Sequence, residues 1–152
     1  MRELLYKAKL KNKDRWIEGF YCCRKETTYC FKEDYEKFPV KTLYYIICDE
    51  MTDWGLPNEF RLYEVDPTTL CQFTGHYDKN GNKIYENDIV KTQYGRLCKV
   101  IWFTSDSHCG FDLEPICATE NLKLKPPSEC FLWNKEALEV VGNVFDNPEL
   151  LE

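Results

Sequence analysis

Only two histidines are present, and neither stands in the setting of a catalytic residue. His108 follows Asp106 and Ser107, so one short stretch holds the three residue types of a hydrolase triad. Triad members meet across a fold rather than along one loop, and this adjacency therefore argues against catalysis. His76 follows a turn glycine and is interpreted as a surface residue or as a partner of Asp78. We expect no catalytic residue at either histidine.

Other patterns that could support catalysis are weak or missing. Glu86 and Asp88 stand two residues apart, so they would share one face of a strand and could form a carboxylate pair. Solvated charge on a hairpin is the simpler interpretation of these two residues. The sequence contains no P-loop, no G-x-S-x-G, no H-E-x-x-H and no dinucleotide-binding fingerprint. The chain is therefore expected to be no enzyme and to need no cofactor.

The nine cysteines favour reduced thiols over a metal site or a disulfide framework. Their number is odd, and they are spread over the whole chain. Structural zinc sites usually contain C-x-x-C pairs, and the sequence has none. The one arguable cluster is formed by Cys98, His108, Cys109 and Cys117, and its spacing matches no common zinc knuckle. We expect no metal site.

The first residues carry no targeting signal. Charges interrupt the apolar residues of MRELLYKAKLKNKD at almost every second position, so no secretory apolar region is present. The apolar runs elsewhere are far shorter than the roughly 20 residues of a membrane-spanning helix. We therefore expect a cytosolic chain, without a membrane partner.

The charge distribution argues against a protein dedicated to nucleic acid. The net charge is −6; residues 1–60 are neutral overall, and residues 61–152 carry the whole excess. Proteins that bind nucleic acid usually show a basic excess, because Lys and Arg contact phosphates. The one basic cluster includes Lys7, Lys9, Lys11, Lys13 and Arg15. It is typical of the solvated face of an edge strand, and nucleic-acid binding there remains the alternative.

The hydrophobic pattern has mostly a period of two residues, which is typical of β-strands with one wet face. A short helix or an irregular loop is expected over 27–39, and Pro126 and Pro127 exclude a regular helix over 122–133. At the end, Asn147 is expected to cap one helical turn. Strands are expected at 6–10, 15–22, 42–49, 59–65, 70–75, 84–92, 96–103, 109–115 and 138–145.

The strand spacing predicts an all-β protein with one or two short helices. Many short strands separated by turn signals indicate a small SH3-like or meander barrel. The turn-forming segment DWGLPNE at 53–59 is the expected boundary. We therefore expect an N-terminal β-hairpin layer with a variable insert at 1–58, and a barrel core at 59–152. The two parts are expected to pack as one compact unit.

Three blocks of sequence resemble the YopX family of phage and prophage proteins. They are RWIEGF at 15–20, VDPTTLCQFTGHYDKNGNKIYENDIVK at 65–91 and LEVVGNVFDNPELL at 138–151. The middle block is the most specific, with Q-x-T-G, D-K-N-G and I-Y-E-x-D-I-V in close order. The resemblance implies a β-rich phage or prophage protein that forms oligomers in some members and has no established activity. Asn87 replaces a glycine usual in the family, and asparagine also tolerates a left-handed backbone.

The middle block is explained by structural roles. Thr74–Gly75 and Asn80–Gly81 are expected to set turns, and Asp78 to accept hydrogen bonds from backbone amides two residues on. Asp88 is expected to cap the loop before its strand. The apolar residues expected in a core or an interface are Ile84, Tyr85, Ile89 and Val90.

Two functions remain open. The 23 aromatic residues are more than a small barrel can bury, so some are expected at interfaces, with Trp16, Tyr85 and Trp102 as candidates. The first hypothesis is therefore a non-enzymatic module that forms a homo-oligomer and binds an unidentified host or phage protein. The alternative is an SH3-like module that binds nucleic acid through its basic first strand.

Overall fold

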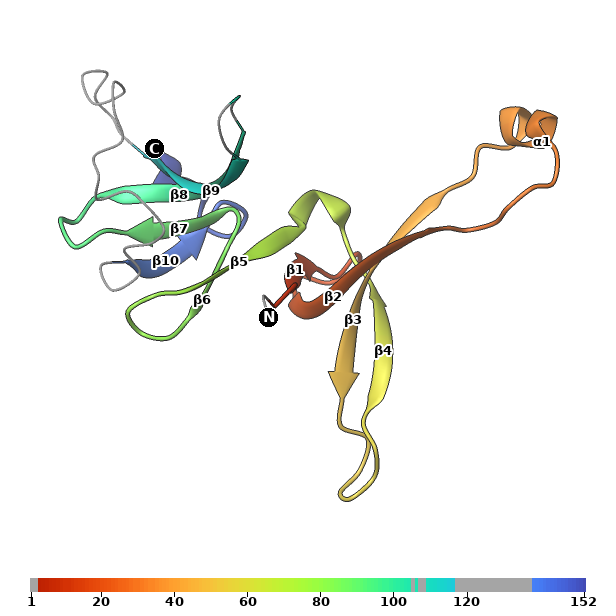
Figure 1. Ribbon diagram of the computed structural model, residues 1–152, viewed down its shortest axis with the longest axis horizontal. Coiled ribbons are helices and arrows are strands. Elements are labelled where there is room, and N and C mark those ends of the chain that lie inside the picture. Colours follow the sequence, from red (N-terminus) through yellow and green to blue (C-terminus); the bar gives the residue numbers. More distant parts are fainter. Residues whose placement is uncertain (1–2, 105, 107–108, 117–137) are drawn as a thin grey trace. The chain divides into compact units, whose positions relative to one another are not determined.

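The computed structural model describes residues 3–104, 106, 109–116 and 138–152, and they form two compact units (Figure 1). One unit spans Leu5–Leu70; the other contains Cys71–Glu152 together with the first residues of the chain. Strands make up most of the described structure, so the prediction of an all-β fold is confirmed. The SH3-like form of the barrel stays a prediction. The units divide after Leu70 rather than after residue 58, because the strand that starts at Glu59 pairs with the strand before it.

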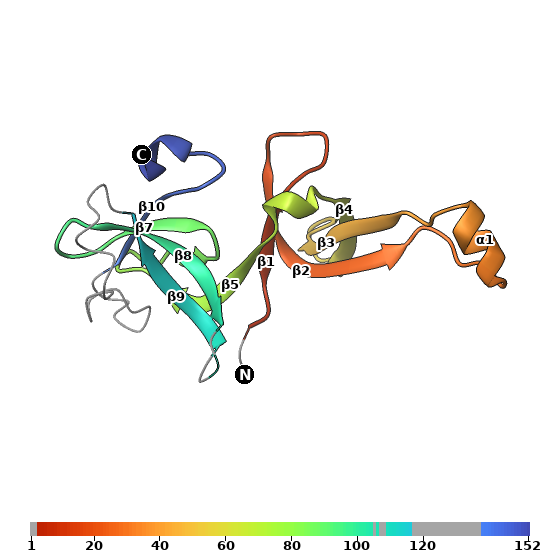
Figure 2. The same cartoon turned by 90° about the horizontal axis from the view of Figure 1, so that it is seen from above.

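The N-terminal unit is an antiparallel sheet in the order β4-β3-β2-β1 (Figure 2). The helix α1 (Lys32–Lys37) lies at the far end of the β2–β3 ribbon, and a 3-10 turn follows at Pro67–Thr69. The six-residue helix settles the ambiguity over 27–39. The strands are β1 (Tyr6–Lys9), β2 (Trp16–Lys25), β3 (Thr42–Glu50) and β4 (Glu59–Glu64).

This sheet curls until its first and last strands meet. Leu10 forms a β-bridge with Val65, the Lys11 amide donates to the Glu64 carbonyl at 3.2 Å, and the Asp66 amide donates to the Lys9 carbonyl at 2.9 Å. The curl brings the alternate side chains of one face inside, where Ala8, Ile46 and Val65 are buried. The result is a small, partly closed barrel with an inner and an outer face.

Gly19 permits the bend of β2. A Cβ atom at this position would lie 2.2 Å from the Ile47 carbonyl oxygen, which is backbone and cannot rotate away. Any side chain would therefore push β3 off β2 where the sheet turns. Glycine in the interior of a strand often marks such a close approach of two backbones.

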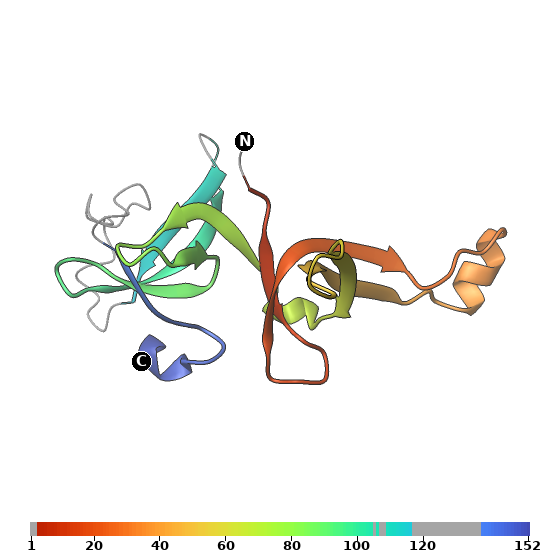
Figure 3. The ribbon, with the colours of Figure 1, turned by 90° about the horizontal axis from the view of Figure 1, so that it is seen from below.

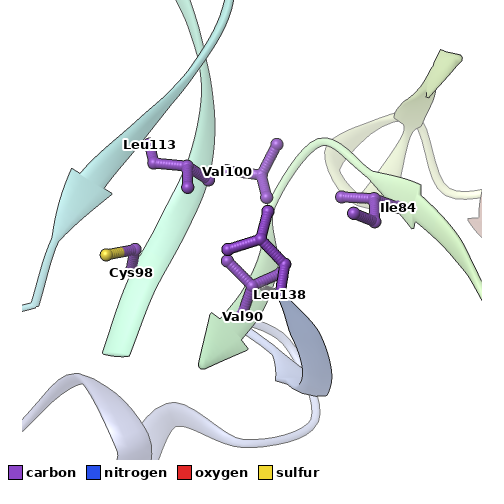
Figure 4. Close-up of a cluster of buried hydrophobic side chains, with 6 residues drawn as sticks. All are labelled: Ile84, Val90, Cys98, Val100, Leu113 and Leu138. Atoms are coloured by element: carbon purple, nitrogen blue, oxygen red, sulfur yellow. The ribbon is translucent and has the colours of Figure 1, made fainter. Parts of the chain in front are cut away.

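The C-terminal unit contains a second antiparallel sheet, in the order β10-β7-β8-β9, and the paired strands β5 and β6 (Figure 3). Its core is a cluster of Ile84, Val90, Cys98, Val100, Leu113 and Leu138, whose side chains are drawn in Figure 4. The strands are β5 (Cys71–Tyr77), β6 (Lys83–Tyr85), β7 (Asp88–Lys91), β8 (Leu97–Thr104), β9 (Cys109–Pro115) and β10 (Glu139–Asn143), followed by a 3-10 turn at Pro148–Leu151.

Two details of the family block differ from the expectation. The single strand expected over 84–92 is broken into β6 and β7, because Asn87 adopts the left-handed region at φ 65°. Thr74 and Gly75 lie within β5 rather than in a turn, and the β5–β6 pairing shifts register between Phe73 and Tyr77. Gly75, at φ 88°, therefore belongs to an irregularity of the strand.

The last strand and the chain end follow the prediction in outline. The β10–β7 pairing shifts register between Val140 and Gly142. The helical turn after Asn147 forms, but its cap was predicted wrongly. The Asn147 side chain makes no capping bond; its oxygen accepts a hydrogen bond from the Asn143 amide at 3.3 Å. The segment 122–133 lies outside the described residues.

The carboxylate of Asp78 joins the D-K-N-G loop to the last strand. One oxygen accepts hydrogen bonds from the amides of Asn80 and Asn82, both at 2.8 Å, which confirms the predicted role in the loop. The other oxygen accepts from the Val140 amide at 3.0 Å. Burial pushes the pKa of Asp78 upward, but the hydrogen bonds from Val140, Asn82 and Asn80 outweigh it, so the pKa lies below its ordinary value.

Replacing Asp78 should destabilise the C-terminal unit. Asp78→Ala removes the acceptor of three backbone amides, and we expect a loss of about 3 kcal/mol in the free energy of unfolding, measured by urea titration near neutral pH. A lowered pKa means that the ionised group stabilises the fold above about pH 4, and that this contribution disappears as the pH falls through the folded-state pKa. The difference between wild type and Asp78→Ala should therefore shrink as the pH falls below about 4.

The exposed Glu36 in α1 provides a matched control. Glu36→Ala should change the free energy of unfolding by less than about 0.5 kcal/mol. An Asp78→Ala protein as stable as the control would show that the three hydrogen bonds contribute nothing to stability.

Candidate protein-interaction surface

The outer face of the N-terminal sheet carries a row of apolar side chains. The strand register places Phe20 of β2, Ile47 of β3 and Leu62 of β4 directly opposite one another. Phe20 is 50% exposed and Leu62 is 54% exposed, and Phe60, two residues before Leu62, lies on the same face and is also exposed. An apolar patch of this kind is unusual on a monomer and is typical of a surface that contacts a partner.

A lysine-flanked tryptophan borders this row on the β1 side. Lys7 and Lys9 of β1 pair with Glu18 and Trp16 of β2, so these four residues share the outer face with Phe20. The Lys7 and Lys9 ammonium nitrogens lie 5.2 and 5.6 Å from the centre of the Trp16 ring. At such distances the ring attracts the cations, which hold Trp16 half-buried between the two lysine side chains.

Acidic neighbours compensate much of the predicted basic cluster. Lys9 contacts Asp14 at 2.6 Å, and Lys11 forms an ion pair with Glu64. The hydrogen bond to Glu64 raises the pKa of Lys11 above its ordinary value. Lys13 and Arg15 are exposed and belong to neither of these two ion pairs. The basic surface is therefore smaller than the count of basic residues indicates.

A cavity of about 260 Å³ lies where β1 and β4 meet. Three of its charged groups have partners within the protein. Lys11 pairs with Glu64, and the Asp66 carboxylate accepts hydrogen bonds from the amide and the hydroxyl of the neighbouring Thr68 at 2.9 and 2.7 Å. Neither cysteine nor histidine lines it, so it offers no thiol nucleophile or imidazole base. The lining residues are Lys11, Lys41, Thr42, Tyr44, Glu64, Val65, Asp66 and Pro67.

The three aromatic interface candidates lie in different surroundings. Tyr85 is only 4% exposed, and its ring packs 5.5 Å from that of Phe73, so it belongs to the core and is not available as a surface residue. Trp102 is 47% exposed, and its ring lies nearly perpendicular to that of Phe111 on the β8–β9 ribbon, with 4.9 Å between the ring centres. Trp16 lies in the other unit, so the three do not form a single surface patch within either unit.

Asp88, one of the described residues considered for a chemical role, makes a structural contact. The buried carboxylate of Asp88 accepts a hydrogen bond from the Tyr85 amide at 2.7 Å, which agrees with the predicted cap. The carboxylate pair of Glu86 and Asp88 was expected on one strand, but Glu86 lies between β6 and β7, where Asn87 turns the backbone. The His76 amide donates to the Thr74 hydroxyl at 3.2 Å.

The two described members of the arguable cysteine–histidine cluster lie apart. Cys98 is buried and pairs with Pro115 at one end of the β8–β9 ribbon, whereas Cys109 is exposed and pairs with Thr104 at the other end. The remaining two members, His108 and Cys117, lie outside the described residues.

No prediction from the sequence covers the exposed apolar side chains of the loop between β3 and β4. The loop between β3 and β4 carries Met51, Trp54 and Leu56, and Trp54 is 91% exposed. The segment was interpreted only as a domain boundary, because its Gly, Pro and Asn indicate turns. The available signal was the presence of large apolar residues inside a turn sequence, where water-facing loops usually have polar ones.

The family assignment rests on almost the whole chain, since the YopX protein family matches residues 2–152. The chain belongs to the YopX family. No curated protein matches this YopX-family chain. Among solved structures, protein EF1440 from Enterococcus faecalis is similar to it, with 16% sequence identity, full coverage of both chains and a TM-score of 0.50. At this identity the likeness concerns the fold alone. No helix among the described residues is long and apolar enough to cross a membrane.

Substitutions on the two faces of the N-terminal sheet should differ strongly in their effect on stability. Leu62→Ser, on the outer face, should change the free energy of unfolding of the dilute protein by less than about 0.5 kcal/mol. Ile46→Ala, in the inner cluster, should cost about 2–4 kcal/mol, because it removes a buried side chain and leaves a cavity. Urea titration measures both values. Equal losses at the two positions would contradict the assignment of the faces.

Proposed function

We propose that the protein is a non-enzymatic accessory protein of a phage or prophage, which acts in the bacterial cytosol by associating with itself and with another protein. The observation that supports this most directly is the apolar row of Phe20, Ile47 and Leu62 on the outer face of the N-terminal sheet, in which Phe20 and Leu62 are exposed and Ile47 is half-buried. The inner face of the same sheet already provides the core. The outer row is therefore not needed for folding. An apolar surface on a protein partner would cover it best.

Physical magnitudes favour a protein partner for this face. Burying one large apolar side chain contributes about 1.5–3 kcal/mol, and aromatic residues dominate the energy of protein interfaces. Phe20 and Phe60 both lie on the outer face and are exposed. Contacts that cover these two rings and Leu62 would supply a central apolar patch, with the lysines of β1 as its polar rim.

Self-association should be visible by analytical ultracentrifugation. We expect the wild-type protein to sediment as an oligomer at concentrations on the order of tens of micromolar. The double substitution Phe20→Ser and Leu62→Ser should weaken association at least about tenfold, because it replaces apolar contacts without touching the core. Tyr94→Ser, at an exposed aromatic residue of the other unit, is the matched control and should leave association unchanged. A strictly monomeric wild-type protein would contradict the proposal.

Nucleic-acid binding by the β1 side of the sheet is the second candidate. It is supported by the arrangement of Trp16 beside Lys7 and Lys9, since single-stranded nucleic acid stacks its bases on aromatic rings next to basic side chains. The ion pairs of Lys9 and Lys11 with acidic residues weaken this argument.

A gel-shift titration at low salt discriminates between the two functions. Single- and double-stranded DNA and RNA should leave the wild-type protein unshifted if protein binding is its role. A shift that disappears on raising the salt and in a Trp16→Ala variant would instead establish nucleic acid as the ligand.

A further inference from the structure

The hairpin between β3 and β4 ends in a segment that we call the finger, residues 49–60. Its loop projects from the N-terminal unit beyond the paired ends of the two strands (Figure 1). Large apolar side chains on it face solvent, and Trp54 is exposed almost completely. None of them belongs to the inner cluster of the unit. The exposed apolar residues of the finger are Met51, Trp54, Leu56 and Phe60.

Hydrogen bonds within the finger order the backbone of the loop that carries Trp54. The Asp53 carboxylate accepts from the Trp54 amide at 2.7 Å, and the Asp53 carbonyl accepts from the Leu56 amide at 3.2 Å. The Thr52 hydroxyl donates to the Pro57 carbonyl at 3.0 Å. A loop ordered before binding loses less conformational entropy when it meets a partner. The finger is therefore built to present an aromatic side chain.

The finger is acidic, and a basic segment of opposite charge lies elsewhere on the same chain. Residues 49–60 contain Asp49, Glu50, Asp53 and Glu59 and neither Lys nor Arg, a net charge of −4. Residues 7–15 contain five basic residues and one acidic residue, a net charge of +4. Outside these ranges, Arg61 pairs with Glu50 at 3.4 Å and Glu64 pairs with Lys11, so each segment loses one charge to a neighbour and the two remain opposite and equal.

The loop that carries Trp54 is held away from Lys11 of its own copy. Lys11 contacts Glu64 at one end of β4, and residues 51–58 lie beyond Glu59 at the other end. The six residues of β4 span about 20 Å. The base of the finger, by contrast, follows Cys48, whose thiol donates to the Glu18 carbonyl at 3.1 Å. Trp54 at the tip therefore does not reach Lys11 within one copy, and a second copy can offer it a basic segment.

We propose that the finger of one copy docks on the basic end of the outer face of a second copy. Trp54 packs against the apolar surface of Phe20 and Trp16 there, and the acidic residues of the finger face Lys13 and Arg15 at the end of the β1–β2 hairpin beside it. The inference rests on the proposed self-association and names its two surfaces. Because each copy offers one finger and one acceptor surface, the interface is head-to-tail and generates rings or chains rather than a symmetric pair.

Mixing two variants tests this arrangement. The finger variant carries Trp54→Ser and Leu56→Ser, and the acceptor variant carries Lys13→Glu and Arg15→Glu; all four side chains are exposed. We expect each variant alone to sediment as a monomer where the wild type associates. A mixture of the two should form a one-to-one heterodimer, because one supplies an intact acceptor and the other an intact finger. Raising the salt from about 0.05 to about 0.5 M should weaken wild-type association several-fold.

Matched controls separate this proposal from general effects of charge and hydrophobicity. Lys32→Glu with Lys37→Glu changes the net charge equally, and Tyr94→Ser removes an exposed ring elsewhere; both should associate like the wild type. Circular dichroism checks the fold of every variant, and Glu59→Lys replaces the finger variant if that protein is unfolded.

The outcomes distinguish the two proposals. If the wild type associates and both variants associate equally well, or if the mixture gives no heterodimer, the finger is not the contact and this inference is overturned. Self-association through the outer face would then still stand. If the wild type stays monomeric at tens of micromolar, the proposed self-association itself fails.

Discussion

The buried carboxylate of Asp78 is the interaction on which the C-terminal unit depends. It accepts hydrogen bonds from the D-K-N-G loop and from Val140, which lies 62 residues further along the chain. A second bond joins the same two segments, since the Lys79 amide donates to the Leu138 carbonyl at 3.0 Å. Leu138 in turn is fully buried in the core cluster. The loop therefore positions the last strand, and the last strand completes the core.

The N-terminal unit is stabilised differently. Its inner cluster has only three fully buried residues, and a ring of half-buried aromatic and aliphatic side chains surrounds them. The curl of the sheet, which Gly19 permits and the Leu10–Val65 bridge closes, brings this cluster together. Much of the β2–β3 and β3–β4 ribbons extends beyond the cluster. The apolar residues of these parts are therefore not buried in the core and are available to a partner. The proposed interaction surfaces are thus a direct result of a small core in a long-stranded sheet.

The sequence predicted the strands well because their side chains alternate, and alternation survives any tertiary arrangement. The block from Asp78 to Val90 was also predictable, since Asn80–Gly81 and Asp78 specify a loop through local hydrogen bonds. The division between the units was not, because it depends on which strand β4 pairs with, and turn residues such as Gly55 and Pro57 look alike in a hairpin and in a linker. For a related reason the sequence left Tyr85 between the core and an interface: an aromatic residue in a strand gives no sign of which face is covered. The finger was missed because exposure is a property of the folded chain.

The pairing of β10 with β7 also determines the order in which the chain can mature on the ribosome. The unit Leu5–Leu70 is continuous, so it can fold as soon as its own residues have emerged. The other unit must wait for nearly the whole polypeptide, because its core lacks Leu138 and its Asp78 carboxylate lacks the Val140 amide until translation is almost finished. During that interval Ile84, Val90 and Val100 have no complete core to enter. Nascent chains truncated before β10 should thus carry one folded unit and one unfolded unit, whose exposed apolar residues are prone to aggregation and would bind chaperones.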